Sequence, residues 1–174
     1  MPDRTPTKTT NLDGYGNAVL PWERARAELV KVFSGAATPH FLGTGGPDGR
    51  PHVAGVGAAW FDGDLYFTSN LAARKARNLA ANPACTIAVS LTGIDLTIRG
   101  TAERVTDTAT LERVAKIYRD GGWPTQVEGD ALTAPYSAPS AGPPPWHLFR
   151  FTFDTVVGNA TAEPHGATRW RFAR

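Results

Sequence analysis

The sequence predicts a mainly β protein with a few short helices (α+β), in which six strands form a small antiparallel barrel. At least six segments have the composition or the two-residue alternation of strands, and turn residues such as Asp62-Gly63 separate several of them. Three segments have helical spacing, one before the first strand and two between later strands. Because strands joined by tight turns pair antiparallel, a parallel, doubly wound fold is excluded.

Length and composition indicate one globular domain. The chain has 174 residues, of which 41% are hydrophobic and 20% charged, as in ordinary soluble proteins. Residues 1–19 are polar, and we expect an N-terminal arm, either loose or extended along a partner, ahead of a single domain over residues 20–174. A net charge of +2 without a basic run argues against nucleic-acid binding.

The sequence shows no sign of a membrane-bound or secreted protein. No apolar run approaches the roughly 18 residues of a membrane span, and the first residues lack the apolar stretch of a signal peptide. We therefore expect a cytoplasmic protein. The single cysteine, Cys85, excludes an internal disulfide and is expected to be a buried, inert thiol. The four histidines lack metal-ligand spacing, which argues against a metal site.

The first half of the chain predicts a helix and three strands. Proline suits a first helical turn, and an amphipathic helix is expected from Pro21 to Phe33. Gly55 and Gly57 weaken the second strand, and predict a bulge or the close approach of its backbone to a flat group. The three strands, expected to form a meander, are residues 40–44, 50–61 and 65–68.

The second half continues the alternation of strands and helices. A short alanine-rich helix ends at Asn82-Pro83, and Asp107 is expected to cap a helix that begins at Thr108. Residues 123–146 hold six prolines and little periodicity; they predict a loop folded over a binding site, a lid, or else a flap without a role. The remaining strands are expected at 86–91, 94–105 and 147–157, with a last strand or hook at 168–172.

The stretch from Leu65 to Leu91 carries the main functional signal. Arg74 and Lys75 fall in or near the first turn of the short helix, where the helix dipole disfavours a cation by about 0.3–1 kcal/mol. An anion is favoured there by a similar amount. Two adjacent cations at this place indicate a phosphate bound between them and the helix end; the alternative is a pair of solvated surface residues.

Side-chain chemistry elsewhere is sparse, and the catalytic residues remain unknown. No Gly-x-Ser-x-Gly elbow, HExxH motif or other nucleophile with an adjacent base is present. This absence favours chemistry carried by a bound cofactor.

The same stretch resembles the pyridoxamine 5′-phosphate oxidase-like superfamily of flavin-binding, FMN-binding-protein-like split β-barrels. The similarity extends more loosely over about residues 24–157. The matching residues are Phe67-Thr68, Ser69-Asn70, Arg74-Lys75, Asn82-Pro83, Thr86–Leu91 and Ile98-Arg99-Gly100-Thr101-Ala102 followed by Asp107.

The resemblance implies a homodimer with a cofactor site at the subunit interface. Arg74 and Lys75 would bind the cofactor phosphate, and the strand from Arg50 to Val56 would lie along the flavin ring. His52 would hydrogen-bond the cofactor, or serve as a structural histidine. The expected cofactor-binding residues are Arg50, His52, Val53, Gly55, Thr68, Ser69, Arg74, Lys75, Asp95, Trp170 and Arg171.

Two departures from the pyridoxamine phosphate oxidases argue against vitamin B6 oxidation. A flavin-contacting Gln of those enzymes corresponds to Asp95 here, and their C-terminal Arg-x-His is absent. The ending at residues 168–172 resembles actinobacterial family members that use the deazaflavin coenzyme F-420 or are uncharacterised flavin reductases. Trp170 and Arg171 would close the site of their own subunit or of the neighbouring one, or would form a hook that pins the barrel.

The sequence therefore predicts an oxidoreductase that binds coenzyme F-420 or FMN, with a slight preference for the deazaflavin, and transfers a hydride to a small organic substrate. Two alternatives are a non-catalytic flavin- or haem-binding protein and an FMN-dependent pyridoxamine 5′-phosphate oxidase. Nothing in the sequence identifies the substrate.

Overall fold

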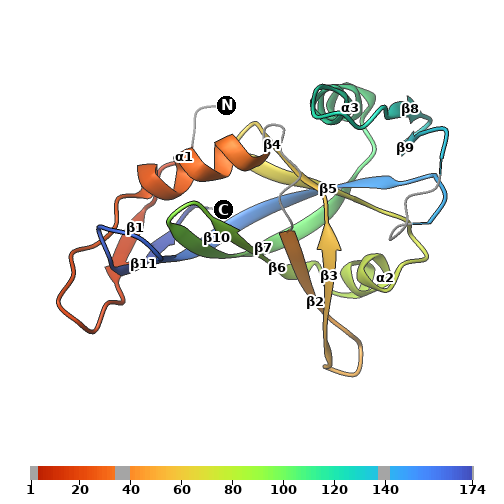
Figure 1. Cartoon of the computed structure of the whole chain (residues 1–174). Coiled ribbons are helices and arrows are strands. Elements are labelled where there is room, and N and C mark those ends of the chain that lie inside the picture. The colour runs from red at the N-terminus through yellow and green to blue at the C-terminus, as the bar shows by residue number, and fades with distance from the viewer. Residues whose placement is uncertain (1–3, 34–39, 137–141, 174) are drawn as a thin grey trace.

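The computed structural model describes residues 4–33, 40–136 and 142–173, and confirms a mainly antiparallel β fold with three short helices (Figure 1). The helices are α1 (Trp22–Phe33), α2 (Arg74–Ala81) and α3 (Thr108–Asp120). The strands are β1 (Lys8–Asn11), β2 (His40–Gly45), β3 (Pro51–Val56), β4 (Ala58–Phe61), β5 (Asp64–Ser69), β6 (Ala84–Leu91), β7 (Ile94–Val105), β8 (Gln126–Glu128), β9 (Ala131–Thr133), β10 (His147–Ala160) and β11 (Ala167–Arg171).

The main sheet has nine strands in the described residues, rather than the six expected. Its central order is β4-β5-β10-β7-β6-β2-β3. The long strand β10 pairs with β7 along most of its length, and on its other side with β5 near its start and with β11 near its end. Two of the three extra strands are β1 and β11, which extend the barrel sheet at that end; the third arises because residues 50–61 form two strands, β3 and β4.

The predicted strand at 50–61 is wrong in one respect, because the chain changes partner at Gly57. Residues 51–56 pair with β2, whereas residues 58–61 pair with β5. β3 and β4 do not pair with each other, so the expected three-stranded meander is two separate hairpins. The barrel sheet is therefore open between two strands that are consecutive in the chain. Asp62 and Gly63 form the second turn with φ of 52° and 81°, which suits this Asp-Gly pair.

Two apolar clusters fill the interior. The larger cluster joins the inner faces of the strands to α1 and α2, with Leu42, Phe67, Ile87 and Phe151 fully buried. The smaller one lies under α3, whose N-cap carboxylate on Asp107 accepts from the Thr110 N–H at 2.8 Å, as predicted. In the view of Figure 1, α1 and α3 lie on one side of the long strands and α2 on the other.

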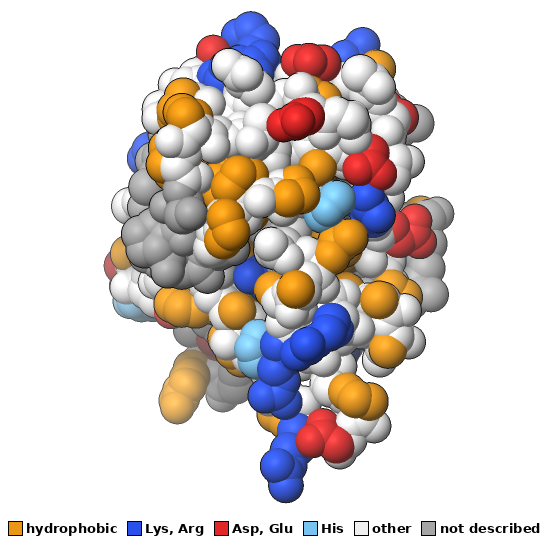
Figure 2. Space-filling view, turned by 90° about the vertical axis from the view of Figure 1, so that its right-hand side faces the viewer, with side chains coloured by type: hydrophobic (Ala, Val, Ile, Leu, Met, Phe, Trp, Pro, Cys, Tyr) orange, Lys and Arg blue, Asp and Glu red, His pale blue; other side chains and the backbone are white. Residues whose placement is uncertain are grey.

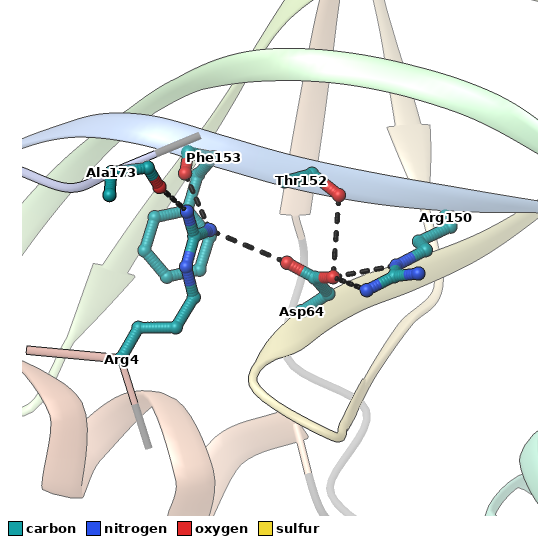
Figure 3. Close-up of polar contacts among 6 residues, drawn as sticks. All are labelled: Arg4, Asp64, Arg150, Thr152, Phe153 and Ala173. Atoms are coloured by element: carbon teal, nitrogen blue, oxygen red, sulfur yellow. Dashed lines mark hydrogen bonds and ion pairs between the residues drawn. The ribbon is translucent and has the colours of Figure 1, made fainter. Parts of the chain in front are cut away.

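The N-terminal arm lies against the same chain. β1 pairs antiparallel with β11, which confirms a strand at residues 168–171. The Arg4 guanidinium donates to the carbonyl oxygens of Phe153 and Ala173, and lies 4.7 Å from the centre of the Phe153 ring. The buried Asp64 is between Arg4 and Arg150 (Figure 3), so this arm is tied to the barrel by charge as well as by strand pairing.

The proline-rich segment contains more structure than its sequence indicates. β8 and β9 form a hairpin, and Leu132 bridges to Trp146 just before β10 begins. Trp146 is fully buried and packs beside Trp123 with ring centres 5.4 Å apart. Residues 137–141 of this segment lie outside the described residues. No helix in the part of the chain that the structure describes is long and apolar enough to cross a membrane.

Candidate functional site

The first turn of α2 is open to a ligand. The N-cap residue is Ala73, with φ of −67° and ψ of 145°, and it has no side chain that could accept from the first N–H groups. The preceding Asn70 carboxamide accepts from the Ala72 N–H at 2.8 Å and shapes the entry of the chain. Arg74 and Lys75 are the first two residues of the helix. The N–H groups that begin a helix attract anions when no side chain caps them.

Lys75 is the most unusual side chain of this region. It is only 8% exposed, yet among the described residues it has neither an ion pair nor a hydrogen bond. Burial lowers the pKa of its ammonium group. A buried cation without a counter-charge is unfavourable, so this position suits a ligand that supplies negative charge.

Arg74 extends the cationic surface, and Arg77 joins it one helical turn later. Both are exposed, and both line a hollow of about 440 Å³ between α2 and the β2–β3 turn. Neither has an ion pair in the described part of the chain. Arg50 is exposed on this turn. Figure 2 shows Lys and Arg side chains gathered at the lower end of one face of the molecule. Sequence reasoning missed Arg77, although its i+3 spacing from Arg74 places it on the same helical face.

A second hollow, of about 580 Å³, lies on the other side of the same turn. Gly43, Thr86 and Arg99 are in register across β2, β6 and β7, and all three line it. Their neighbours Leu42, Ile87 and Ile98 are fully buried, so the hollow is on the outer face of the sheet. Arg99 was not among the expected site residues. Its position in the alternation of the strand at 94–105 was the signal for an outward-facing cation.

The structure brings the β3 residues close to α2, which packs against β2 and β3. Arg50 is exposed just before β3, with its Nε 3.7 Å from the Asp48 carboxylate. His52 is half-buried, and its Nδ1 is sealed from solvent without a hydrogen bond. Val53 is 63% exposed on the outer face, where the neighbouring Gly55 leaves the strand bare. An exposed strand surface of this kind can accommodate a flat group.

Thr68 and Ser69 end β5 and point to opposite faces of the sheet. Ser69 is fully buried and donates its hydroxyl to the Asn70 carbonyl oxygen at 3.0 Å, whereas Thr68 is half-buried. Ser69 also pairs with His147 at the start of β10.

Asp95, Trp170 and Arg171 lie away from α2 within one chain. Trp170 pairs with Val156, nine positions along β10 from the residue that pairs with Ser69, which is roughly 30 Å of extended strand. Trp170 is fully buried and packs on Trp22 at 5.5 Å. Asp95 is near the β6–β7 turn and accepts from the Ser90 hydroxyl at 2.5 Å. A fully buried tryptophan has no surface for a ligand, so in this chain Trp170 packs the barrel end.

Other reactive groups are few. Burial raises the pKa of the Cys85 thiol to about 12, which confirms an inert cysteine. Among residues 4–33, 40–136 and 142–173, no three His, Cys, Asp or Glu side chains form a group that could bind a metal. The geometry therefore offers an uncapped helix start with unpaired cations, beside a bare strand and a shallow outer hollow.

A split antiparallel β-barrel of this kind defines the fold class of the flavin-binding split-barrel proteins. The chain belongs to the pyridoxamine 5′-phosphate oxidase family, whose N-terminal domain model matches residues 27–159. Members of this family include flavin-dependent oxidoreductases. No curated protein matches the sequence.

Solved structures support the fold assignment. A putative 5-nitroimidazole antibiotic resistance protein from Bacteroides thetaiotaomicron superposes with a TM-score of 0.58 at 17% identity, over 96% of this chain and 92% of its own. A NimC/NimA family protein from Clostridium acetobutylicum gives 0.53 at 16% identity, over 84% and 93%. A putative pyridoxamine 5′-phosphate oxidase from Listeria innocua gives 0.54 at 17% identity, over 78% and 96%. At these identities the similarity shows the fold alone.

Proposed function

We propose that this protein is an oxidoreductase that binds a phosphorylated flavin or deazaflavin, with its phosphate at the start of α2. The observation that carries this proposal is the buried Lys75 without a counter-charge. A phosphate dianion would neutralise it, accept from the uncapped N–H groups of the helix, and form charge-assisted hydrogen bonds with Arg74. Family membership supplies the class of cofactor.

Three more of the expected residues have defined roles in this proposal. The cofactor would supply the redox chemistry, and the protein would supply position and electrostatics. The bare outer surface of β3 around Gly55 would support the ring, whereas the Nδ1 of His52 is sealed from solvent and suits a structural role rather than a hydrogen bond to the cofactor. Ser69 would fix the chain before α2 through its bond to Asn70.

A homodimer is part of the proposal. Phe41 is 50% exposed and Val53 63% exposed, on adjacent strands β2 and β3. Large apolar side chains that share one sheet face are typical of surfaces that another chain covers. A second copy on this face would exclude water from the neighbouring cofactor site.

FMN and coenzyme F-420 both remain candidates. The slight preference for the deazaflavin rested on the C-terminal ending, and within one chain Trp170 lies in the barrel interior rather than at α2. The cationic surface of Arg74, Lys75 and Arg77 fits any phosphorylated cofactor of this kind.

The test is a titration of the purified protein with FMN and with coenzyme F-420, followed by quenching of tryptophan fluorescence. We expect micromolar or tighter binding of one cofactor, and about a tenfold loss in Arg74→Gln, since a charge-assisted hydrogen bond contributes about 1.5–3 kcal/mol. Arg113→Gln is the matched control, because Arg113 is exposed on α3 and has no ion pair in the described residues.

Failure of both cofactors to bind at micromolar concentration would refute the proposal. Yellow FMN that survives purification would decide for FMN. Reduction of an organic acceptor by the reduced cofactor, or oxidation of pyridoxamine 5′-phosphate, would separate an enzyme from a protein that only stores its cofactor.

A further inference from the structure

A separate cavity lies beside the hairpin of β8 and β9. It has a volume of about 340 Å³ and is lined by the turn between these strands and by the residues that lead into β10. Glu128, Asp130 and His147 contribute polar groups, and Pro144 and Pro145 contribute apolar surface. Neither Arg74 nor Lys75 lines it, so the cavity is distinct from the cationic start of α2.

His147 is the central polar group of this cavity. The residue is 9% exposed, and its Nδ1 is sealed from solvent without a hydrogen-bond partner. The nearest carboxylate oxygen, Asp130 Oδ1, is 3.9 Å from Nδ1, which is too far for a hydrogen bond. Because Nδ1 is sealed from solvent and faces Asp130, a ligand in the cavity would contact the imidazole at Nε2, which is not sealed.

Asp130 is held in place by a residue of a third strand. Arg104, near the end of β7, donates from Nη2 to Asp130 Oδ2 at 2.6 Å, so the other carboxylate oxygen is left on the His147 side. Three segments that are far apart in the sequence thus converge: the end of β7, the β8–β9 turn and the start of β10. The result is a carboxylate that Arg104 orients, with one oxygen on the side of the His147 imidazole.

The charge balance of the cavity favours a cation. Glu128 and Asp130 carry two negative charges, and Arg104 offsets one of them. Burial, followed by the field of Arg104, lowers the pKa of the His147 imidazole, so the ring is neutral near pH 7. The lining therefore has an excess negative charge and neutral acceptors, which is the opposite of the surface at α2.

We propose that this cavity binds a small organic cation that carries at least one N–H donor, such as a primary ammonium group attached to an apolar ring. The ammonium would donate to the Asp130 carboxylate and to the imidazole of His147, with Glu128 as a second counter-charge. The apolar part would pack on Pro144 and Pro145. The proposal goes beyond the cofactor site and does not depend on it.

The experiment uses the full chain and three probes of similar shape: benzylammonium, benzyl alcohol and benzoate. Binding is followed by titration calorimetry and by the NMR signals of the histidine rings. We expect benzylammonium to bind and to shift the His147 signals, benzyl alcohol to bind at least tenfold more weakly, and benzoate to leave those signals unchanged.

Charge variants test whether benzylammonium binds in this cavity. Asp130→Asn and Glu128→Gln should each weaken benzylammonium binding about tenfold. Glu128 is exposed, so its variant keeps the fold even if Asp130→Asn unfolds the hairpin. Glu163→Gln makes the same change of charge at an exposed position near β11 and should have no effect.

Acidification provides an independent readout. Protonation of His147 would place a second cation beside the ligand, so affinity should fall as the pH decreases below neutrality, and His147→Gln should remove much of this dependence. The proposal is overturned if benzoate binds at His147 as well as benzylammonium does, if none of the probes shifts the His147 signals, or if Glu128→Gln and Glu163→Gln behave alike. Cofactor binding at α2 would be unaffected by any of these results.

Discussion

Asp64 and Lys75 are both buried charged side chains, but only Asp64 has partners of opposite charge. Asp64 is 3% exposed and accepts from Arg150 Nη2 at 2.5 Å and Nε at 2.6 Å, with Thr152 at 3.3 Å and Arg4 at 3.5 Å (Figure 3). Lys75 is 8% exposed and has no such partner in the described residues.

The difference separates a charge that serves the fold from one that serves a ligand. The carboxylate of Asp64 joins β5, β10 and the N-terminal arm, so its burial is compensated within the chain. The burial of Lys75 is not compensated, and the protein carries that cost until an anion binds. Removing the charge of Asp64 should therefore lower the free energy of unfolding, whereas removing the charge of Lys75 should raise it.

The largest effect is expected from Asp64→Asn. The variant would leave Arg4 and Arg150 beside a neutral amide, and removing one partner of a buried ion pair is strongly destabilising. Because Arg150 is half-exposed, we expect a loss of about 2–3 kcal/mol in the free energy of unfolding, measured by urea denaturation. Asp48→Asn, at an exposed pair, should change it by less than about 0.5 kcal/mol. Equal losses of stability in Asp64→Asn and Asp48→Asn would contradict the stabilising role of the buried Asp64 ion pairs.

Lys75→Met should have the opposite sign. Replacing an uncompensated buried cation by an apolar side chain of similar length is expected to raise the free energy of unfolding of the ligand-free protein by about 1 kcal/mol. The same variant should lose cofactor affinity by about tenfold to a hundredfold. Thermal unfolding with and without cofactor measures both changes. A variant that is less stable without cofactor would show that Lys75 serves the fold.

The smallest effect is a dependence of stability on pH. Burial lowers the pKa of the His40 and His147 imidazoles below the ordinary value of 6.5. Below that value the unfolded chain binds more protons than the folded one, so stability should fall as the pH is lowered through and below 6.5. Urea denaturation at pH 7.5 and pH 5.5 measures this change, and His147→Gln should make it smaller. An unchanged slope in that variant would exclude His147 as a contributor.

Local signals in the sequence predicted several elements of the fold and the site. The Asp62-Gly63 turn, the Asp107 cap and the Asn82-Pro83 stop depend on neighbouring residues, and all three are present in the structure. The position of Arg74 and Lys75 at a helix start follows from the same short-range rules. The apolar alternation of the long strands similarly indicated which residues face the core.

Features that depend on distant partners were not predictable in this way. The change of partner at Gly57 depends on β2 and β5, which compete for the two halves of one predicted strand. The hairpin of β8 and β9 lies in a proline-rich segment without strand periodicity. It is held by a bridge between Leu132 and Trp146, which lies outside the hairpin. Trp170 was a candidate for the site because residues 168–172 resemble the C-terminal ending of certain family members. In the folded chain, however, Trp170 lies beside Trp22 and Val156.

The sequence by itself determined the antiparallel class, the position of each helix and the adjacent cations that begin α2, because capping, turn formation and periodicity act over a few residues. Only the tertiary structure decided which charges have partners. Asp64 meets Arg150 from 86 positions away, Asp130 meets Arg104 and faces His147, and Lys75 meets no carboxylate in the described chain. Such pairings follow from the register of distant strands.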